Sequence, residues 1–598
     1  MLGGVPPQHD PNPDTGLSPA GSGTRARVAS DNAGGVRTRA GNLDELLTRR
    51  RVLRDAAYGG GSLALASGLG SSAVGAALRR HGAVPLPTPA QVRASFQRMV
   101  DFGPRLTGNR AHNRFVAWLE REFSRAGCHL LPCDVYETSR WEVSKVGLDV
   151  LEGTGRGPVR VGTYFPRSKE TPRGGVTGPL VYGGVAPQVS INGSDFDALR
   201  AGLARYPADL ASWARALPST LSGPVAGSVL LVDLPAPLPT TAGVFAADMT
   251  YYNGQGESLA ELAASDYKRL WLHPGLAMPL EEFTALGVKG VVFILDASYA
   301  ALRGQYIPFE WQNEGVPALY VDRDAGSKLR ARAGTRPRTR LTLAATRRTV
   351  PIPTVTAVLP GASRETVIFN THTDGQGFVE ENAPVGFVHL ARHFASLPAR
   401  RRVRRTLVFA AWPGHMSNDL PQAQGWIDTH KGLMARAAAA LTVEHLGCSE
   451  WTDSTAGGYR ATGRPELFAI WTSQGKMFDL TKAAVVRHDL PRTALMRPPA
   501  QFGVGGPFYQ AGVPEIGAIA GPEYLLTISK NGEMDKLDAR LAARQIAAIA
   551  DLAKSLDSVS ARELRTGDPL LGSPSPKGNI EPSSAVPRPA SCRPAARA

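Results

Sequence analysis

The 598-residue sequence predicts an α/β protein, in which a mixed, mostly parallel sheet flanked by helices is interrupted by a mainly β domain. After residue 346, strand-like apolar runs alternate with helical stretches, and this alternation favours a parallel sheet covered by helices. Between residues 174 and 345 the apolar runs are short and separated by Gly and Pro, which is typical of a mainly β module. Because the alternation resumes after this module, we interpret it as an insertion.

The part before the insertion begins with a helical pattern. Phe115, Leu119 and Phe123 recur at the spacing that lines one face of a helix, and Gly127 is a typical helix end. Strand-like runs follow between residues 141 and 164. After the insertion we predict, in order, a strand ending at His372, a helix over 382–397, a strand over 407–412, a helix near 433–440 and a strand ending at Glu444.

Both ends of the chain lack apolar periodicity. Residues 1–47 and 561–598 are rich in Gly, Pro, Arg and Ser, which predicts a disordered leader and a disordered tail. Residues 48–77 combine paired arginines with a mildly apolar stretch and resemble a twin-arginine export signal. This interpretation predicts an extracellular or cell-envelope protein, whereas the alternative is a short basic helix followed by a Gly-rich linker. No other segment is long and apolar enough to span a membrane permanently.

The formal charge of +15 does not indicate a nucleic-acid partner. The arginines are scattered, and no basic stripe is interleaved with aromatic residues. Four cysteines are too few for a disulfide scaffold. Cys128 and Cys133 are close enough in sequence to pair in an oxidising compartment, although small buried or free thiols are the simpler interpretation.

Three strand-like runs in series end in a His or lead into a carboxylate: VIFNTHTDG, RTLVFAAWPGH and AAALTVEHLG. In open α/β sheets, ligands gather beyond the carboxyl ends of the strands. We therefore predict a metal site formed by His372, Glu381, His415 and Glu444, because imidazole and carboxylate are zinc ligands. The alternative is that these residues are ordinary solvated loop residues.

Two further carboxylates accompany His372. Asp374 lies two residues later, where it can hold the ring of a metal-bound imidazole in one orientation. Glu380 precedes Glu381 in a turn that leads into a helix. First-turn charge at a helix start is the alternative explanation for this acidic pair.

Together with RLTGNRAHNR before the long helix and GGPFYQAGVPEIG near the end, these motifs resemble the M28 peptidases, zinc aminopeptidases and carboxypeptidases with an inserted protease-associated (PA) domain. The resemblance covers about residues 88–558. It implies a peptidase-like (phosphorylase/hydrolase-like) domain over 84–170 and 346–560, a PA-like domain over 174–345, a peptide or amide substrate and one or two zinc ions.

Carried over by position, the resemblance makes His372 the first ligand, Asp374 its orienting partner, Glu381 the bridging carboxylate and Glu444 a further ligand. The sequence departs from the family's pattern at two places. Gly414 and His415 stand where the family has two consecutive glutamates, the general base and a ligand. Ile528 and Ser529 stand near the place of the last His ligand.

The surviving donors leave two interpretations open. Four ligands, with His415 replacing the lost Glu, close a tetrahedral shell and describe a structural site. If one of them is not a ligand, a single catalytic metal remains, with Glu380, His445 or Glu450 as the base. The sequence thus predicts an exported M28-like metallohydrolase, with a catalytically inactive binding protein as the alternative, and other amide chemistry, such as cyclisation of an amino-terminal glutamine, as a third option.

Overall fold

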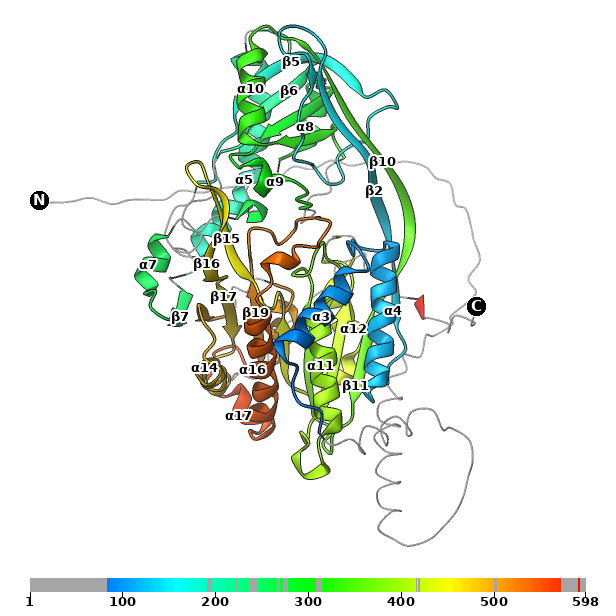
Figure 1. The fold of residues 1–598 in the computed structure, drawn as a ribbon, viewed down its shortest axis with the longest axis vertical. Helices are drawn as coiled ribbons and strands as arrows, with labels where there is room; N and C mark the ends of the chain where they lie inside the picture. Colours follow the sequence, from blue (N-terminus) through cyan, green and yellow to red (C-terminus); the bar gives the residue numbers. More distant parts are fainter. Residues whose placement is uncertain are drawn as a thin grey trace, which may run out of the picture.

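The computed structural model describes residues 83–190, 196–221, 223–235, 246, 248–265, 269–272, 278–307, 314–415, 417, 420–498, 503–571 and 590–591. The predicted leader (1–47) and export signal (48–77) lie outside the described residues. The described chain forms two sheet-containing bodies, and the long strands β2 (Asp134–Val150) and β10 (Arg338–Pro353) run from one to the other (Figure 1).

The first sheet has the strand order β1-β11-β13-β12-β14-β19-β17-β18-β7. Its central strands β13, β12 and β14 are parallel to one another, and β19 continues the parallel set. The antiparallel pairs lie toward the two edges. The strands are β1 (His129–Leu130), β11 (Val355–Leu359), β13 (Thr406–Trp412), β12 (Thr366–His372), β14 (Ala437–Val443), β19 (Glu515–Ala520), β17 (Phe468–Thr472), β18 (Thr493–Met496) and β7 (Met249–Asn253).

Helices cover both faces of this sheet. Side chains alternate along β12, so that Phe369 joins the larger core and Ile368 joins a second core on the opposite face. The larger core includes α3 (Pro89–Val100), α4 (Arg110–Arg125), α11 (Ala383–Ser396), α14 (Lys476–Arg487) and α16 (Ala539–Asp557). The second includes α12 (Gln422–Thr429), α13 (Lys431–Met434) and α15 (Gly506–Gln510). The predicted α/β architecture is therefore present.

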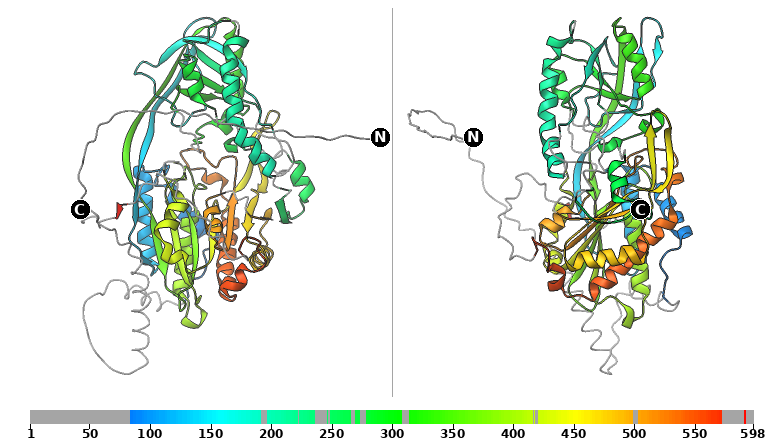
Figure 2. Two further views of the ribbon diagram at one scale, coloured as in Figure 1. Left: turned by 180° about the vertical axis from the view of Figure 1, so that it is seen from behind. Right: turned by 90° about the vertical axis from the view of Figure 1, so that its left-hand side faces the viewer.

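The second sheet has the order β20-β2-β10-β5-β6-β8-β9-β4, with β3 paired to β2. Its remaining strands are β3 (Gly157–Pro158), β4 (Thr163–Tyr164), β5 (Val176–Val185), β6 (Val229–Asp233), β8 (Gly290–Ile294), β9 (Ala318–Val321) and β20 (Ala590–Ser591). Figure 2 shows the long helix α5 (Phe196–Thr220) beside this sheet. The pairs β5–β6, β6–β8 and β8–β9 are parallel, and a helix lies in each of their connections.

This region contains more helix than the mainly β texture of its sequence indicates. Besides α5 it includes α7 (Leu259–Ala264), α8 (Leu280–Ala285), α9 (Tyr299–Leu302) and α10 (Arg323–Ala333). Leu203, Tyr206, Leu210 and Leu217 have helical spacing in α5, but two prolines inside the helix obscure the pattern. In addition, β7 leaves this part of the sequence and pairs with β18 at the edge of the first sheet.

The carboxyl-terminal part is more ordered than its composition predicts. Residues predicted as tail begin with α17 (Ala561–Arg565), whose start is a capping box between Ser560 and Glu563. Leu564 is buried, and Tyr509 donates a hydrogen bond to Asp568. The tail prediction is therefore wrong for residues 561–571, because a short helix with one buried apolar side chain has too little periodicity to be recognised.

Two smaller elements complete the described chain. The strands β15 (Ser449–Ser454) and β16 (Gly458–Pro465) form a hairpin, and 3₁₀ turns occur at Leu270–Leu272, Ala399–Arg401 and Met534–Lys536. None of the helices within the described ranges is both long and apolar enough to cross a bilayer. Cys128 and Cys448 are buried free thiols, whereas Cys133 is disulfide-bonded, so Cys128 and Cys133 do not pair with each other.

Candidate metal centre

The candidate site lies where the parallel strands β12, β13 and β14 end. His372 is the last residue of β12, Glu444 follows β14, and His415 lies three residues after β13. The loop between β12 and α11 returns Glu380 and Glu381, which are joined by a cis peptide bond, to the same edge. The structure thus brings together side chains that the sequence spreads over more than seventy residues, as expected for the carboxyl edge of a parallel sheet.

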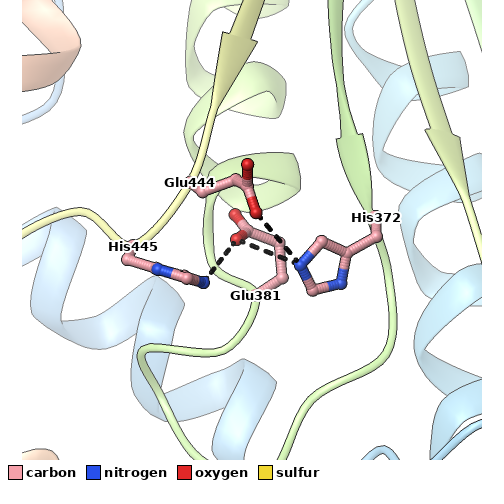
Figure 3. Close-up of side chains that lie close together, drawn as sticks. All are labelled: His372, Glu381, Glu444 and His445. Carbon is pink, nitrogen blue, oxygen red and sulfur yellow. Dashed lines mark ion pairs between the residues drawn. The ribbon is translucent and has the colours of Figure 1, made fainter. Parts of the chain in front are cut away.

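Four side chains converge in the centre of this site: His372, Glu381, Glu444 and His445 (Figure 3). His372 Nε2 lies 3.5 Å from Glu444 Oε2 and 3.7 Å from Glu381 Oε2. His445 Nε2 lies 3.4 Å from Glu381 Oε2. One donor atom from each of the four lies within 4.8 Å of every other. These four residues are called the central cluster below.

Each histidine of the central cluster has one nitrogen held by a backbone carbonyl. His372 Nδ1 donates to the Asp374 carbonyl at 3.0 Å, and His445 Nδ1 donates to the Ala520 carbonyl at 2.6 Å. The other nitrogen, Nε2, faces the cluster and makes no hydrogen bond in either residue. Donation from Nδ1 leaves the lone pair on Nε2, which is the arrangement of a metal-binding histidine.

The two carboxylates are held in the same way. Glu381 Oε1 accepts from the Ala383 N–H at 2.6 Å, and Glu444 Oε1 accepts from the Val504 N–H at 2.9 Å. In both, Oε2 is buried without a hydrogen bond. All four residues of the central cluster are at most 1 % exposed. Four buried polar atoms that lack hydrogen bonds and point toward one another call for a shared partner, because leaving them unsatisfied is costly.

The carboxylates of the cluster favour a positive charge at its centre. Burial acts to lower the pKa of His445, but Glu380, Glu381 and Glu444 outweigh it and raise that pKa to about 9. Burial also acts to lower the pKa of His372, but the surrounding carboxylates raise this pKa well above its ordinary value. Burial raises the pKa of Glu381 to about 8. Without a cation, the site therefore takes up protons that a cation would displace.

Asp374 supports His372 rather than joining the cluster. Its carboxylate accepts from the Thr107 hydroxyl at 2.5 Å and from the Gly414 N–H at 3.2 Å. Burial opposes ionisation, but His372, His112 and Thr107 hold the pKa of Asp374 below its ordinary value. Asp374 Oδ1 lies 3.4 Å from His372 Nδ1. The sequence interpretation gives Asp374 the role of orienting His372, and the carboxylate lies within reach of that ring.

The RLTGNR motif forms the wall behind the site. Arg105 is fully buried, and its Nη2 donates to the carbonyls of Gly377 and Glu380. Its guanidinium lies over the Phe115 ring at 5.0 Å. His112 Nε2 donates to the Thr373 hydroxyl at 2.7 Å. In the sequence, this motif contributes only to the resemblance. Its arginine and threonine, Arg105 and Thr107, are the residues that the structure places beside the site.

Glu380 and His415 lie beside the central cluster. Glu380 Oε2 is 3.1 Å from His445 Nε2, and Glu380 Oε1 is 3.8 Å from both His372 Nε2 and His415 Nε2. Neither carboxylate oxygen of Glu380 makes a hydrogen bond. The side chain of His415 is 22 % exposed, so it lies on the least buried side of the site. The structure therefore places His445 in the central cluster, and it groups the predicted ligand His415 with His372 and Glu380 in a second set that could also hold a metal ion.

Two other predicted positions lie away from the cluster. Gly414 has φ +108°, and a Cβ there would lie 2.7 Å from Leu420 Cβ, so this position does not accept a glutamate side chain without rearrangement. Glu450, a candidate base in the sequence, is instead ion-paired with Arg492 and Arg464. It is therefore engaged in a separate buried ion network.

The donor set of the central cluster fits a metal ion. Two neutral imidazoles and two carboxylates are ligands of Zn²⁺ and related divalent cations, and the four donor atoms are free to bind. Glu380 lies next to the set and adds a third carboxylate as a fifth residue.

The comparisons with solved structures agree with this arrangement of strands. A peptidase M28 precursor from Shewanella amazonensis SB2B is 15 % identical and has a TM-score of 0.52, over 81 % of this chain and 96 % of that chain. The chain has the M28 peptidase fold. At these identities the likeness concerns the fold alone.

Two further structural neighbours are named as aminopeptidases, and one of them is named as a zinc aminopeptidase. The aminopeptidase from Aneurinibacillus sp. strain AM-1 is 16 % identical, with a TM-score of 0.46 over 78 % of this chain and 93 % of that chain. The zinc aminopeptidase BSAP from Bacillus subtilis is 13 % identical, with a TM-score of 0.49 over 80 % of this chain and 98 % of that chain. No family model and no curated protein matches the sequence.

Proposed function

We propose that this protein is an exported metallohydrolase that cleaves peptide or related amide bonds, with one divalent cation held at the central cluster of His372, Glu381, Glu444 and His445 in a shell that keeps one position open for water. The observation that carries the proposal is the set of four buried donor atoms without hydrogen bonds, one from each residue, at the carboxyl edge of the sheet. When bound there, a divalent cation polarises a carbonyl group and acidifies water.

The chain's own residues divide the remaining work. Glu380 has two oxygens without hydrogen bonds beside the cluster, so it is placed to accept a proton from an attacking water. Arg105 holds the Glu380 carbonyl and thereby fixes the loop that carries this carboxylate. Asp374 holds His372 in one orientation. Glu380 thus takes the role for which Gly414 has no side chain.

Export rests on two observations. Paired arginines at Arg49 and Arg50 precede the mildly apolar stretch of the predicted signal. Cys133 is disulfide-bonded, and disulfides persist mainly in oxidising compartments. The proposal therefore gives the protein an extracellular or cell-envelope location.

The test combines metal content with turnover. Elemental analysis of the purified chain should find about one equivalent of metal in the parent and in Glu380→Gln, and none in His372→Ala. Hydrolysis of a panel of aminoacyl p-nitroanilides should fall by about 10²- to 10⁴-fold in Glu380→Gln. His389→Ala, which changes a partly buried histidine outside the site, is the matched control. A parent that binds no metal when supplied with zinc would contradict the proposal.

A second candidate is a catalytically inactive binding protein that keeps a structural metal. It is favoured by the burial of the central cluster, since four donors at most 1 % exposed can close a tetrahedral shell. Under this candidate the parent binds metal, Glu380→Gln changes nothing, and no amide in the panel is cleaved.

A further inference from the structure

A second possible ligand set lies beside the central cluster, on its least buried side. It consists of His372, Glu380 and His415, whose donor atoms lie within 4.8 Å of one another. Glu380 Oε1 is 3.8 Å from both His372 Nε2 and His415 Nε2, and the centroids of the two imidazole rings are 4.4 Å apart. Two imidazoles and a carboxylate are donors for the same divalent cations as the central cluster. These three residues are called the outer set below.

His372 belongs to both sets but has only one nitrogen to offer. Its Nδ1 donates to the Asp374 carbonyl, so the lone pair that can bind a cation is on Nε2. This Nε2 lies 3.5 Å from Glu444 in the central cluster and 3.8 Å from Glu380 in the outer set. Because one lone pair binds one cation, the two complete sets describe alternative positions of a single ion.

The two sets differ in exposure. The side chains of the central cluster are at most 1 % exposed and that of Glu380 is 0 % exposed, whereas the side chain of His415 is 22 % exposed. Among the six residues of the two sets, His415 is therefore the one that a hydrated cation can reach from solution. A cation that leaves water needs protein donors in exchange at each step, because an unpaired buried charge is strongly unfavourable.

Glu380 connects the outer set to the central cluster. Its Oε1 faces His415, and its Oε2 lies 3.1 Å from His445 Nε2. Neither oxygen makes a hydrogen bond, so both are available to a cation. The central cluster has two carboxylates and the outer set has one, so Coulomb attraction favours the inner position.

We propose that His415 is the entry ligand of the metal centre: together with Glu380 and His372, it takes a divalent cation from solution and passes it to the central cluster. In the central position the cation is no longer bound to His415. The inference rests on the cation site of the proposed function. It gives His415 a role in the rates of metal uptake and release, and none in the affinity at equilibrium.

The test measures zinc affinity and zinc exchange separately, on the full chain. Competition with a chromophoric chelator gives the dissociation constant. Stopped-flow mixing of zinc-loaded protein with that chelator gives the release rate, at concentrations where the rate no longer depends on the chelator. The variant is His415→Leu, which keeps a bulky side chain but has no nitrogen. His389→Leu, the same change at a partly buried histidine outside the site, is the matched control.

We expect His415→Leu to slow zinc release at least about tenfold, because the departing cation loses a ligand along its path. The dissociation constant should stay within about threefold of the parent's, so that uptake slows in step with release. His389→Leu should change neither quantity. His415→Ala should also slow release, although its smaller side chain widens the opening. Melting curves of each variant establish that it is folded.

Three outcomes would overturn the proposal. A larger loss of affinity in His415→Leu would make His415 a permanent ligand. A smaller change in its release rate would mean that the cation enters elsewhere. Faster exchange in His415→Ala would mean that the imidazole ring only obstructs the way. A parent that binds no zinc defeats the proposed function itself, whereas a parent that binds zinc and releases it as fast as His415→Leu defeats only the entry ligand.

Discussion

Two buried polar regions of this protein are built on opposite principles. Around the central cluster, the carboxylates of Asp374, Glu380 and Glu381 act on the buried guanidinium of Arg105. The second region joins Arg269, Arg464 and Arg492 to Glu257, Glu450 and Glu466, so that three positive charges meet three negative ones. Both regions adjoin the first sheet, but the carboxylates of the second are paired with arginines, whereas those of the central cluster face His372 and His445.

Hydrogen bonding shows the same contrast. In the ion network, Arg269 Nη2 donates to both carboxylate oxygens of Glu466, at 2.7 and 2.8 Å, and its Nε donates to the Gly521 carbonyl. Arg492 donates to Glu257 at 2.8 Å. Among the described residues, the buried atoms without hydrogen bonds include members of the central cluster and none of this network. A satisfied network stabilises the fold, whereas an unsatisfied one indicates a ligand.

The largest expected effect comes from unbalancing the network. Arg269→Met leaves Glu466 buried without its partner, so the free energy of unfolding should fall by about 3–5 kcal/mol. Arg487→Met, which breaks an ion pair at a side chain 57 % exposed, should change it by less than about 1 kcal/mol. Urea denaturation measures both, and similar losses for the two variants would contradict the comparison.

The central cluster should respond to metal instead. Zinc at about one hundred times its dissociation constant should raise the free energy of unfolding by about 2.7 kcal/mol over the EDTA-treated protein. His445→Ala should abolish this difference, and the control His389→Ala should retain it. Thermal melts with and without EDTA measure the effect, and a parent that melts identically in both would refute the cation site.

Glu523, a buried acid beside this network, makes the free energy of unfolding depend on pH. Burial raises the pKa of Glu523 from 4.5 to about 8, so folding takes up a proton between these values. This contribution to stability is complete below pH 4.5 and is lost as the pH rises through 8. Glu523→Gln should remove this dependence, which amounts to about 1.4 kcal/mol per pH unit between the two pKa values. Denaturation from pH 5 to 8.5 tests this, and parallel curves for parent and variant would contradict it.

The smallest effect concerns the support of the cluster. Thr107→Val removes the hydroxyl that donates to Asp374, so zinc affinity should fall about tenfold, or about 1.4 kcal/mol. Thr481→Val is the matched control, because that buried hydroxyl donates to the Met477 carbonyl away from the site. Competition with a chromophoric chelator measures both affinities. Equal affinities in the two variants would mean that Asp374 does not depend on Thr107.

The sequence predicted the strands that carry the site because their signals are local. Apolar runs ending in His372, at Trp412 and before Glu444 became β12, β13 and β14. One local signal was misleading. The alanine-rich stretch near residues 433–440 suggested a helix, yet Ala437–Val443 is strand β14 and is wholly buried. Pairing with β12 and β19 on both sides overrides the helix propensity of alanine.

The exact membership of the site was beyond the sequence. His415 was predicted as a ligand and His445 as a base, and the structure places His445 Nε2 in the central cluster and His415 in a second possible ligand set with His372 and Glu380. The left-handed backbone of His445, with φ 61°, and its bond to the Ala520 carbonyl decide where its ring points. The Ala520 carbonyl belongs to β19, which begins seventy residues later in the chain.

The sequence by itself determined an α/β fold, the strand ends that meet at one edge and the residue types that a divalent cation accepts. The tertiary structure alone decided which side chains face one another, that Arg105 and Thr107 support the site, and that Ile528 lines a separate cavity. The physical reason is the distance along the chain over which each kind of interaction acts. Strand periodicity and helix capping act over a few neighbouring residues, whereas the direction of a loop side chain depends on contacts with distant segments.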